Sequence, residues 1–214
     1  MLEPILESLN TKTVILASSS PRRSEILRRI GLKFQTIPSV FEENLDKSSF
    51  EHPKDYVLEN AKQKALEVAQ RMRDDKQNNI PDLVIGSDTI VVLENEILEK
   101  PKSKENAFKM LKSLSGREHE VYSGVTLVSH SHSAVGLDKP SLTQFYERTF
   151  VPFGELTDDV INGYIKTEEP MDKAGAYGIQ GIGGSLVSGI RGDYFNVMGF
   201  PLHHFCLQIK KLYE

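Results

Sequence analysis

Apolar and polar positions along the chain switch repeatedly between the spacing of strands and the spacing of helices. Residues 14–16 are a short apolar run of Val, Ile and Leu, which is typical of a buried strand. A polar turn follows, and then Ile26, Leu27 and Ile30 recur at helical spacing. Residues 54–72 carry apolar and alanine side chains on one face, which predicts an amphipathic helix. The first part of the chain therefore predicts strands that alternate with helices.

The rest of the chain continues this alternation. Residues 83–93 predict two apolar strands interrupted at 86–89, and residues 94–96 predict the tip of a hairpin. Polar loops are expected at 74–81 and 129–141. The remaining predicted elements are a helix over 104–114, strands over 119–128, 142–153 and 185–190, a helix capped by Thr157, and a last helix from Pro201 to about Tyr213. Since no repeat or linker interrupts the pattern, it predicts one α/β domain over residues 1–214, with two lobes around a cleft.

Composition and charge narrow the class of protein. The 214 residues are enough for one sizeable core or for two lobes that share a sheet, and 39% hydrophobic content is ordinary for a globular protein. The formal net charge of -4 provides no general attraction for nucleic acid. No apolar run reaches membrane-spanning length, and the first residues do not resemble a signal peptide. The single cysteine, Cys206, fits a reducing compartment, so we expect a cytoplasmic protein.

The polar turn after the first strand is the first candidate for chemistry. Ser20 stands at the N-cap position of the following helix, with Pro21 at its first position and Arg22 and Arg23 next. Backbone N–H groups and two guanidinium groups therefore converge there, which favours an anion such as phosphate. The same residues would also serve simply to cap a helix.

Carboxylates supply a second kind of candidate. Asp88 lies between two apolar runs, which fits either a ligand-binding carboxylate at the end of a core strand or an Asp in a tight turn. Glu42 and Glu43 come from a different segment, and by themselves they are typical of a solvated surface. Such oxygens suit Mg²⁺ or Mn²⁺, and a carboxylate can also orient or deprotonate water.

Basic and glycine-rich positions complete the candidates. Lys64 lies in the second predicted helix, Lys100 precedes Pro101, and Lys173 precedes the glycine-rich residues 175–184. Each alone is typical of a surface charge, whereas together they could converge on a polyphosphate. The glycine-rich segment lacks both a Walker lysine and a dinucleotide-binding fingerprint, but Gln180 within it has an amide that could bind a base.

Seven segments together resemble the Maf family of nucleoside triphosphate pyrophosphatases. In family order they are LASSSPRRSEIL, ENAKQKA, GSDTIV, LEKP, MLKSLSGREHEVYSGV, DKAGAYGIQGIGG and GDYFNVMGFPL. The resemblance covers nearly the whole chain, from about Val14 to Leu212. The resemblance implies a mixed, twisted sheet with flanking helices and two lobes around a nucleotide cleft, as in inosine triphosphate pyrophosphatases. It is greatest to Maf domains that precede a methyltransferase-like domain, so we expect this chain to be the N-terminal part of a longer protein.

The resemblance also implies an activity and roles for individual residues. Members cleave a nucleoside triphosphate between the α- and β-phosphates with a divalent metal, and they commonly form homodimers. Asp88 matches the acid–base position, and a metal bridged by Glu43 and Asp88 is implied. The dTTP/UTP branch carries Arg, Thr and Gln at its specificity positions, which correspond here to Arg22, Thr89 and Gln180. The other matching pocket positions are Ser20, Arg23, Glu43, Lys64, Lys100 and Lys173.

Two alternatives to this interpretation remain open at the level of the sequence. One is hydrolysis of a different nucleotide, such as a modified pyrimidine or an inosine-type purine. The other is a non-catalytic nucleotide-binding module that regulates a fused methyltransferase-like domain. Retention of the acidic and basic motif residues favours the enzyme.

Overall fold

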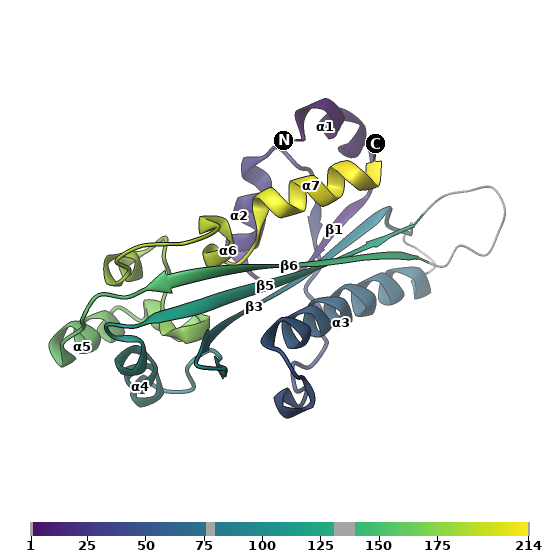
Figure 1. The fold of residues 1–214 in the computed structure, drawn as a ribbon. Helices are drawn as coiled ribbons and strands as arrows, with labels where there is room; N and C mark the ends of the chain where they lie inside the picture. The colour runs from purple at the N-terminus through teal and green to yellow at the C-terminus, as the bar shows by residue number, and fades with distance from the viewer. Residues whose placement is uncertain (1, 76–79, 131–139, 214) are drawn as a thin grey trace. The chain divides into compact units, whose positions relative to one another are not determined.

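The protein is described here by a computed structural model covering residues 2–75, 80–130 and 140–213. Helices flank a mixed sheet, as Figure 1 shows, so the predicted α/β fold is confirmed. The strands are β1 (Val14–Ala17), β2 (Gln35–Thr36), β3 (Leu83–Leu93), β4 (Glu96–Leu98), β5 (Glu118–Ser129) and β6 (Ser141–Pro152). The α-helices are α1 (Glu3–Leu9), α2 (Pro21–Arg29), α3 (Pro53–Asp74), α4 (Lys104–Leu114), α5 (Asp158–Lys166), α6 (Tyr194–Met198) and α7 (Leu202–Tyr213).

The sheet has the strand order β2-β1-β3-β5-β6, and β4 pairs with β3 outside this path. Strand β1 is parallel to both β2 and β3, with Val14 opposite Leu83 and Ala17 opposite Gly86. Strand β4 is antiparallel to β3, which makes the sheet mixed. Glu94 and Asn95, at the tip between β3 and β4, both have positive φ angles, as a tight two-residue hairpin turn requires. The predicted hairpin is therefore confirmed.

The chain forms two compact units that share the long strands. Unit 1 comprises residues 1–88, 124–146 and 199–214, and unit 2 comprises residues 89–123 and 147–198. Each has its own apolar core: Ile15, Val68 and Val84 lie in that of unit 1, and Leu111 and Val121 in that of unit 2. The assignment of residues 1–214 to a single domain stays a prediction, as does the cleft.

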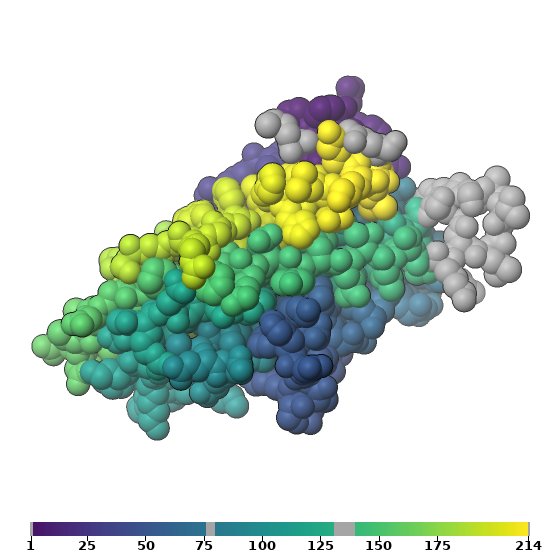
Figure 2. Space-filling view, in the orientation of Figure 1, coloured from purple at the N-terminus to yellow at the C-terminus, as the bar shows by residue number. Residues whose placement is uncertain are grey.

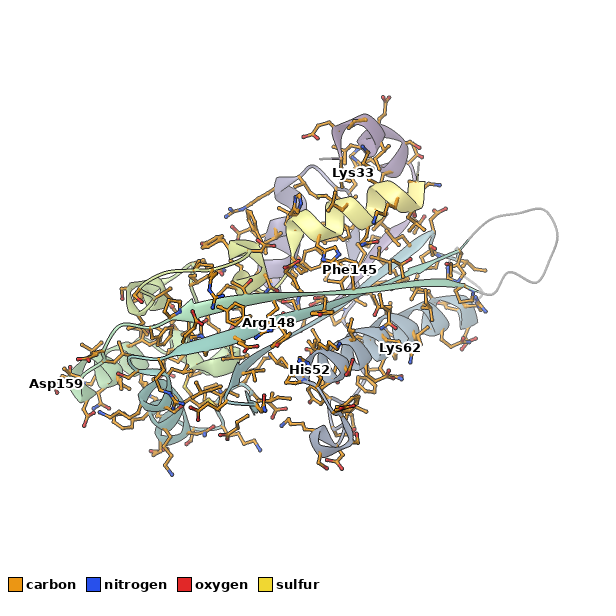
Figure 3. The ribbon with its side chains drawn as sticks, in the orientation of Figure 1. Lys33, His52, Lys62, Phe145, Arg148 and Asp159 are labelled. Carbon is orange, nitrogen blue, oxygen red and sulfur yellow. The ribbon has the colours of Figure 1, made fainter. Side chains whose placement is uncertain are left out.

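Helix α3 contacts the sheet of unit 1 backbone to backbone, at two glycines. A Cβ atom at Gly86 of β3 would overlap the carbonyl oxygen of Ala61, and one at Gly124 of β5 would lie 2.7 Å from the carbonyl oxygen of Val57. His52 begins the helix, since its ring Nδ1 accepts the Lys54 N–H at 3.1 Å (Figure 3). Both glycines lie inside strands, where they permit close packing of the helix and mark no turn.

Strand β3 corrects one prediction. Residues 83–93 form a single strand, so the predicted interruption at 86–89 is wrong, and Asp88 lies neither at a strand end nor in a turn. The polar residues Ser87 and Asp88 are buried inside the strand. Asp88 is accommodated there because the ammonium group of Lys64 faces it from α3 at 2.9 Å.

Unit 2 contains a buried aromatic cluster around His119 of β5. The His119 ring packs edge-on against Phe153 and Tyr177, and its Nε2 is 2.8 Å from the hydroxyl of Tyr177. Only 1% of His119 is exposed, and its Nδ1 has no hydrogen-bond partner among the described residues. Burial lowers the pKa of His119 to about 4, so the ring is neutral in the folded protein at physiological pH.

The ends of helices follow the sequence closely, whereas short irregular segments do not. Ser103 and Thr157 accept N–H groups of α4 and α5, as expected of N-caps, and α7 ends at Tyr213 as predicted. The predicted strand over 185–190 is wrong: Val187 makes only an isolated bridge to Phe153, because the residues before it form a 3-10 turn. The two short helices α1 and α6 were not predicted.

Parts of two predicted loops lie outside the described residues, namely 76–79 and 131–139. No helix among the residues that the structure describes combines the length and the apolar character needed to cross a bilayer.

Substitution of Gly86 by Ala is expected to destabilise the protein by about 3 kcal/mol, because the added methyl group forces α3 away from β3. Urea unfolding measures the difference. Gly163→Ala is the matched control: Gly163 lies inside α5 with open space around it, so this change should stabilise by about 0.5–1 kcal/mol. Equal effects of the two substitutions would contradict the close packing at Gly86.

The stability of the protein is expected to fall in acid because of His119. Its pKa is 6.5 when unperturbed and about 4 when folded, so the unfolded state takes up the proton first as the pH falls. The contribution is complete above about pH 6.5 and is lost toward pH 4; between about pH 7.5 and pH 5 it amounts to about 2 kcal/mol. Urea unfolding at the two pH values measures it.

His119→Phe should remove this part of the pH dependence, whatever it does to stability at neutral pH. His203→Gln should leave the pH dependence unchanged, since His203 is exposed on α7, which lies at the surface in Figure 2. If His119→Phe kept the full pH dependence, the neutral buried state of His119 would be wrong.

Candidate active site

The centre of the candidate site is an ammonium group held between two carboxylates. Lys64 on α3 places its Nζ 2.9 Å from Oδ1 of Asp88 and 2.8 Å from Oε2 of Glu43. The side chains of Lys64 and Asp88 are only 11% and 10% exposed, whereas that of Glu43 is half exposed. Three residues predicted separately from three segments therefore lie together in unit 1.

Helical spacing explains why Lys64, and not its neighbour, reaches the sheet. Ala61 and Ala65 of α3 contact Gly86, and Lys64 lies between them on the same side of the helix. Lys62, labelled in Figure 3, pairs instead with Glu59 at 3.0 Å along the helix, and both of these side chains are about 30% exposed. The small residues beside Lys64 let its long side chain lie against β3.

Burial dominates the electrostatics of Asp88. Burial is the largest effect and raises the pKa of Asp88, and the negative charge of Glu43 raises it further. The positive charges of Lys64 and Arg23 lower this pKa. The net direction is upward. A carboxyl group with a raised pKa can accept a proton more readily at neutral pH than an exposed aspartate, which suits a general base.

The serine turn is organised by Ser18, whose contact with Arg23 the sequence did not indicate. Its Oγ accepts the Ser20 N–H at 3.1 Å and Nη1 of Arg23 at 3.1 Å. Ser20 occupies the N-cap position of α2 as predicted, but its side chain makes no capping hydrogen bond. The signal for Ser18 was its place directly after the buried strand β1, where its side chain is itself buried.

Arg23 connects this turn with the carboxylates. Its Nε donates to the carbonyl oxygen of Gly199 at 3.0 Å, which fixes the guanidinium group. Burial is the largest effect and lowers the pKa of Arg23, and the positive charge of Arg22 lowers it further. The negative charges of Asp88 and Glu43 raise this pKa. Arg23 therefore interacts electrostatically with the Asp88–Lys64–Glu43 cluster, and Arg22 lies close enough to influence it.

The other four candidate residues belong to unit 2. Thr89 is half-buried and its Oγ1 lies 2.8 Å from Oγ of Ser123, a partner that the sequence did not suggest. Lys100 is exposed after β4, and the carbonyl oxygen of the preceding Glu99 accepts the Gly175 N–H at 3.2 Å. The hairpin of β3 and β4 is thus joined to the start of the glycine-rich segment.

Lys173 precedes that segment and Gln180 lies within it, and their surroundings differ. The ammonium group of Lys173 donates to the carbonyl oxygen of Glu169 at 2.6 Å and to Asp172 at 2.5 Å. Gln180 is exposed between Gly178 and Gly181. The structure therefore engages Lys173 in local contacts and leaves the Gln180 side chain accessible to solvent.

The donor set for a metal ion is small. Among the described residues no three His, Cys, Asp or Glu side chains form a metal-binding group. Asp88 and Glu43 are two carboxylates that meet at one ammonium group. Magnesium is commonly bound by one or two carboxylates together with phosphate oxygens of the substrate, so this pair fits such an ion.

Known proteins similar to this chain indicate its family. Over its whole length the chain is 52% identical to a human protein named "Probable bifunctional dTTP/UTP pyrophosphatase/methyltransferase protein", of which it spans only 34%. It is 42% identical to a protein of Bacillus cereus named "dTTP/UTP pyrophosphatase", covering 96% of this chain and 92% of that one.

One solved structure, a HAM1 protein from Coxiella burnetii, aligns with 94% of this chain and 99% of its own at a TM-score of 0.48 and 14% identity. The family model described as "Maf-like protein" matches residues 13–212. Because that match extends over almost the whole chain, and the Bacillus relative is covered nearly end to end, the chain belongs to the Maf-like protein family.

Proposed function

We propose that this chain is a nucleoside triphosphate pyrophosphatase that hydrolyses dTTP and UTP, or modified pyrimidine nucleotides, to the monophosphate and pyrophosphate. The observation that carries the proposal is the buried Asp88–Lys64 pair with Glu43 on the same ammonium group, beside Arg23. The names of relatives at 42–52% identity support the same activity and substrates.

Asp88 accepts a proton from the water that attacks the α-phosphorus, a role that its raised pKa supports. Lys64 and Arg23 neutralise the developing charge on the phosphate oxygens, because positive charge in a buried site acts through a low dielectric. N–H groups of the serine turn, with Ser20, hold a phosphate at the start of α2. Lys100 and Lys173 hold the remaining phosphates; Lys173 would exchange its contact with exposed Asp172 for one to the substrate.

Arg22, Thr89 and Gln180 select the base. An amide such as that of Gln180 has one donor and one acceptor edge, which complement the acceptor and donor of uracil or thymine. Its exposure supports a role that becomes complete only when a nucleotide is bound.

A divalent cation, Mg²⁺ or Mn²⁺, fits the two carboxylates, and Asp88 and Glu43 would hold it. Bound there, it supplies charge neutralisation and polarisation of phosphate oxygens. Lys64 provides part of the same neutralisation from the protein itself.

We also infer that the protein works in the cytoplasm as a homodimer, apart from nucleic acid and membranes. The free, buried thiol of Cys206 supports a cytoplasmic location. The net charge of -4 supports the absence of nucleic acid as a partner, and the dimer rests on family resemblance. Light scattering of the purified chain should give about twice the monomer mass of 24.1 kDa. A mass equal to one chain at micromolar concentration would contradict the dimer.

The proposed activity predicts metal-dependent release of pyrophosphate. Purified protein should form pyrophosphate from dTTP and UTP at least about tenfold more efficiently than from purine triphosphates or dCTP, and a chelator should abolish the reaction. Detection of pyrophosphate across a panel of nucleotides measures both. Nucleotide binding without turnover would instead support the non-catalytic module.

Asp88→Asn is the matching test of mechanism. It keeps the shape of the side chain but removes the base, so turnover should fall at least about a hundredfold while the melting temperature shows that the fold is kept. Glu42→Gln, at the exposed residue next to Glu43, should leave turnover unchanged. Near-normal turnover by Asp88→Asn would exclude Asp88 as the base.

A further inference from the structure

Residues 178–183 carry Gln180 but lack the regular hydrogen bonds of a strand or α-helix. A side chain that discriminates between bases works best when it is held in one place, because a mobile side chain can adapt to the wrong base and pays an ordering cost on binding. Something outside regular structure must therefore fix this segment.

The carboxylate of Glu169 holds the C-terminal end of the segment. Its Oε2 accepts the Ile182 N–H at 2.9 Å, and its Oε1 accepts the Gly183 N–H at 2.9 Å. Glu169 lies in a separate 3-10 turn, Glu169–Asp172, so these bonds join two pieces of chain.

The same carboxylate holds the N-terminal end through a tyrosine. The Tyr164 hydroxyl donates to Oε1 of Glu169 at 2.9 Å and accepts the Gly178 N–H at 3.1 Å. One side chain therefore restrains residues on both sides of Gln180.

The segment leaves no room for a further side chain where it meets this anchor. A Cβ atom at Gly181 would overlap the Glu169 carboxylate, and one at Gly183 would overlap the Tyr164 hydroxyl. The side chain of Lys173 fills the space beside Gly178, 2.6 Å from where a Cβ would lie, while its ammonium group donates to the carbonyl oxygen of Glu169. The segment and its anchor are thus shaped to each other.

The protonation states suit these bonds. Burial acts to raise the pKa of Glu169, but the hydrogen bonds from Gly183, Ile182 and Tyr164 prevail and lower it. Burial raises the pKa of Tyr164, which keeps its hydroxyl protonated. An ionised acceptor therefore receives three donors, the arrangement in which hydrogen bonds are strongest.

We propose that Glu169 is a positioning residue for base selection: it restrains residues 178–183 at both ends and so fixes Gln180 where it contacts the base. This inference rests on the proposed function, in which Gln180 selects pyrimidine nucleotides.

Glu169→Gln tests the proposal. Whichever oxygen becomes an NH₂ group, that group then faces an N–H or O–H donor, so at least one restraint is lost. The KM for UTP should rise about tenfold and the preference over purine triphosphates should fall by a similar factor, whereas kcat changes less than about twofold. Amide hydrogen exchange at Gly178, Ile182 and Gly183 should become faster.

Glu168→Gln is the matched control. Glu168 is the adjacent, exposed residue whose ion pair with Lys104 lies at the surface, so the change should leave preference and exchange as they are. Gln180→Ala should lose the preference by itself, and adding Glu169→Gln to it should cause no further loss, because both act through one contact.

A fall in kcat that is equal for all nucleotides, with preference and exchange unaltered, would overturn the proposal. If the wild type releases no pyrophosphate, the proposed hydrolysis fails separately. Binding of non-hydrolysable UTP and GTP analogues then decides: loss of pyrimidine preference in Glu169→Gln supports the positioning role, and equal binding of both analogues by the wild type refutes it.

Discussion

The contact of helix α3 with the sheet at backbone distance is the constraint on which the candidate site depends. Glycine stands at two places where the helix meets the strands, Gly86 and Gly124. Because no side chain separates the two backbones, Lys64 spans the distance to Asp88 with its ammonium group at hydrogen-bond length. With a larger residue at Gly86 the helix would move outward, and Asp88 would be left as a buried charge without its partner.

Burial of the Lys64–Asp88 ion pair costs folding free energy, and the chemistry of the pair explains why the protein keeps it. Taking Lys64 and Asp88 out of water costs several kcal/mol per ion, of the order that their attraction returns. Glu43 adds a second carboxylate from a half-exposed position, so the ammonium group is satisfied from two sides. An apolar pair would pack as well, but it could neither move a proton nor neutralise a triphosphate.

The sequence predicts what local rules determine and misses what tertiary contacts determine. Capping by Thr157 follows from the residues themselves, and this cap forms. The position of Asp88 was mistaken because Gly86 resembles a turn signal until the helix opposite it is known. Glu169 carries no motif signal, since its three partners are backbone and hydroxyl groups of other segments. Of the residues that the family resemblance named, Glu43, Lys64 and Asp88 lie together in unit 1. The anchoring of Arg23 by Ser18 emerged only from the fold.

The register of strand β3 decides which way two residues of the proposed function face: Asp88, the proposed general base, and Thr89, a proposed specificity residue. Asp88 and Thr89 are consecutive on β3, so their side chains point to opposite faces of the sheet. The pairing of Ala17 with Gly86 fixes that register, which turns Asp88 toward α3 and lets Thr89 meet Ser123. A slip of one residue would exchange these faces and present Ser87 or Thr89 to Lys64. The parallel pairing of β3 with β1 therefore decides which side chain of β3 faces the buried Lys64.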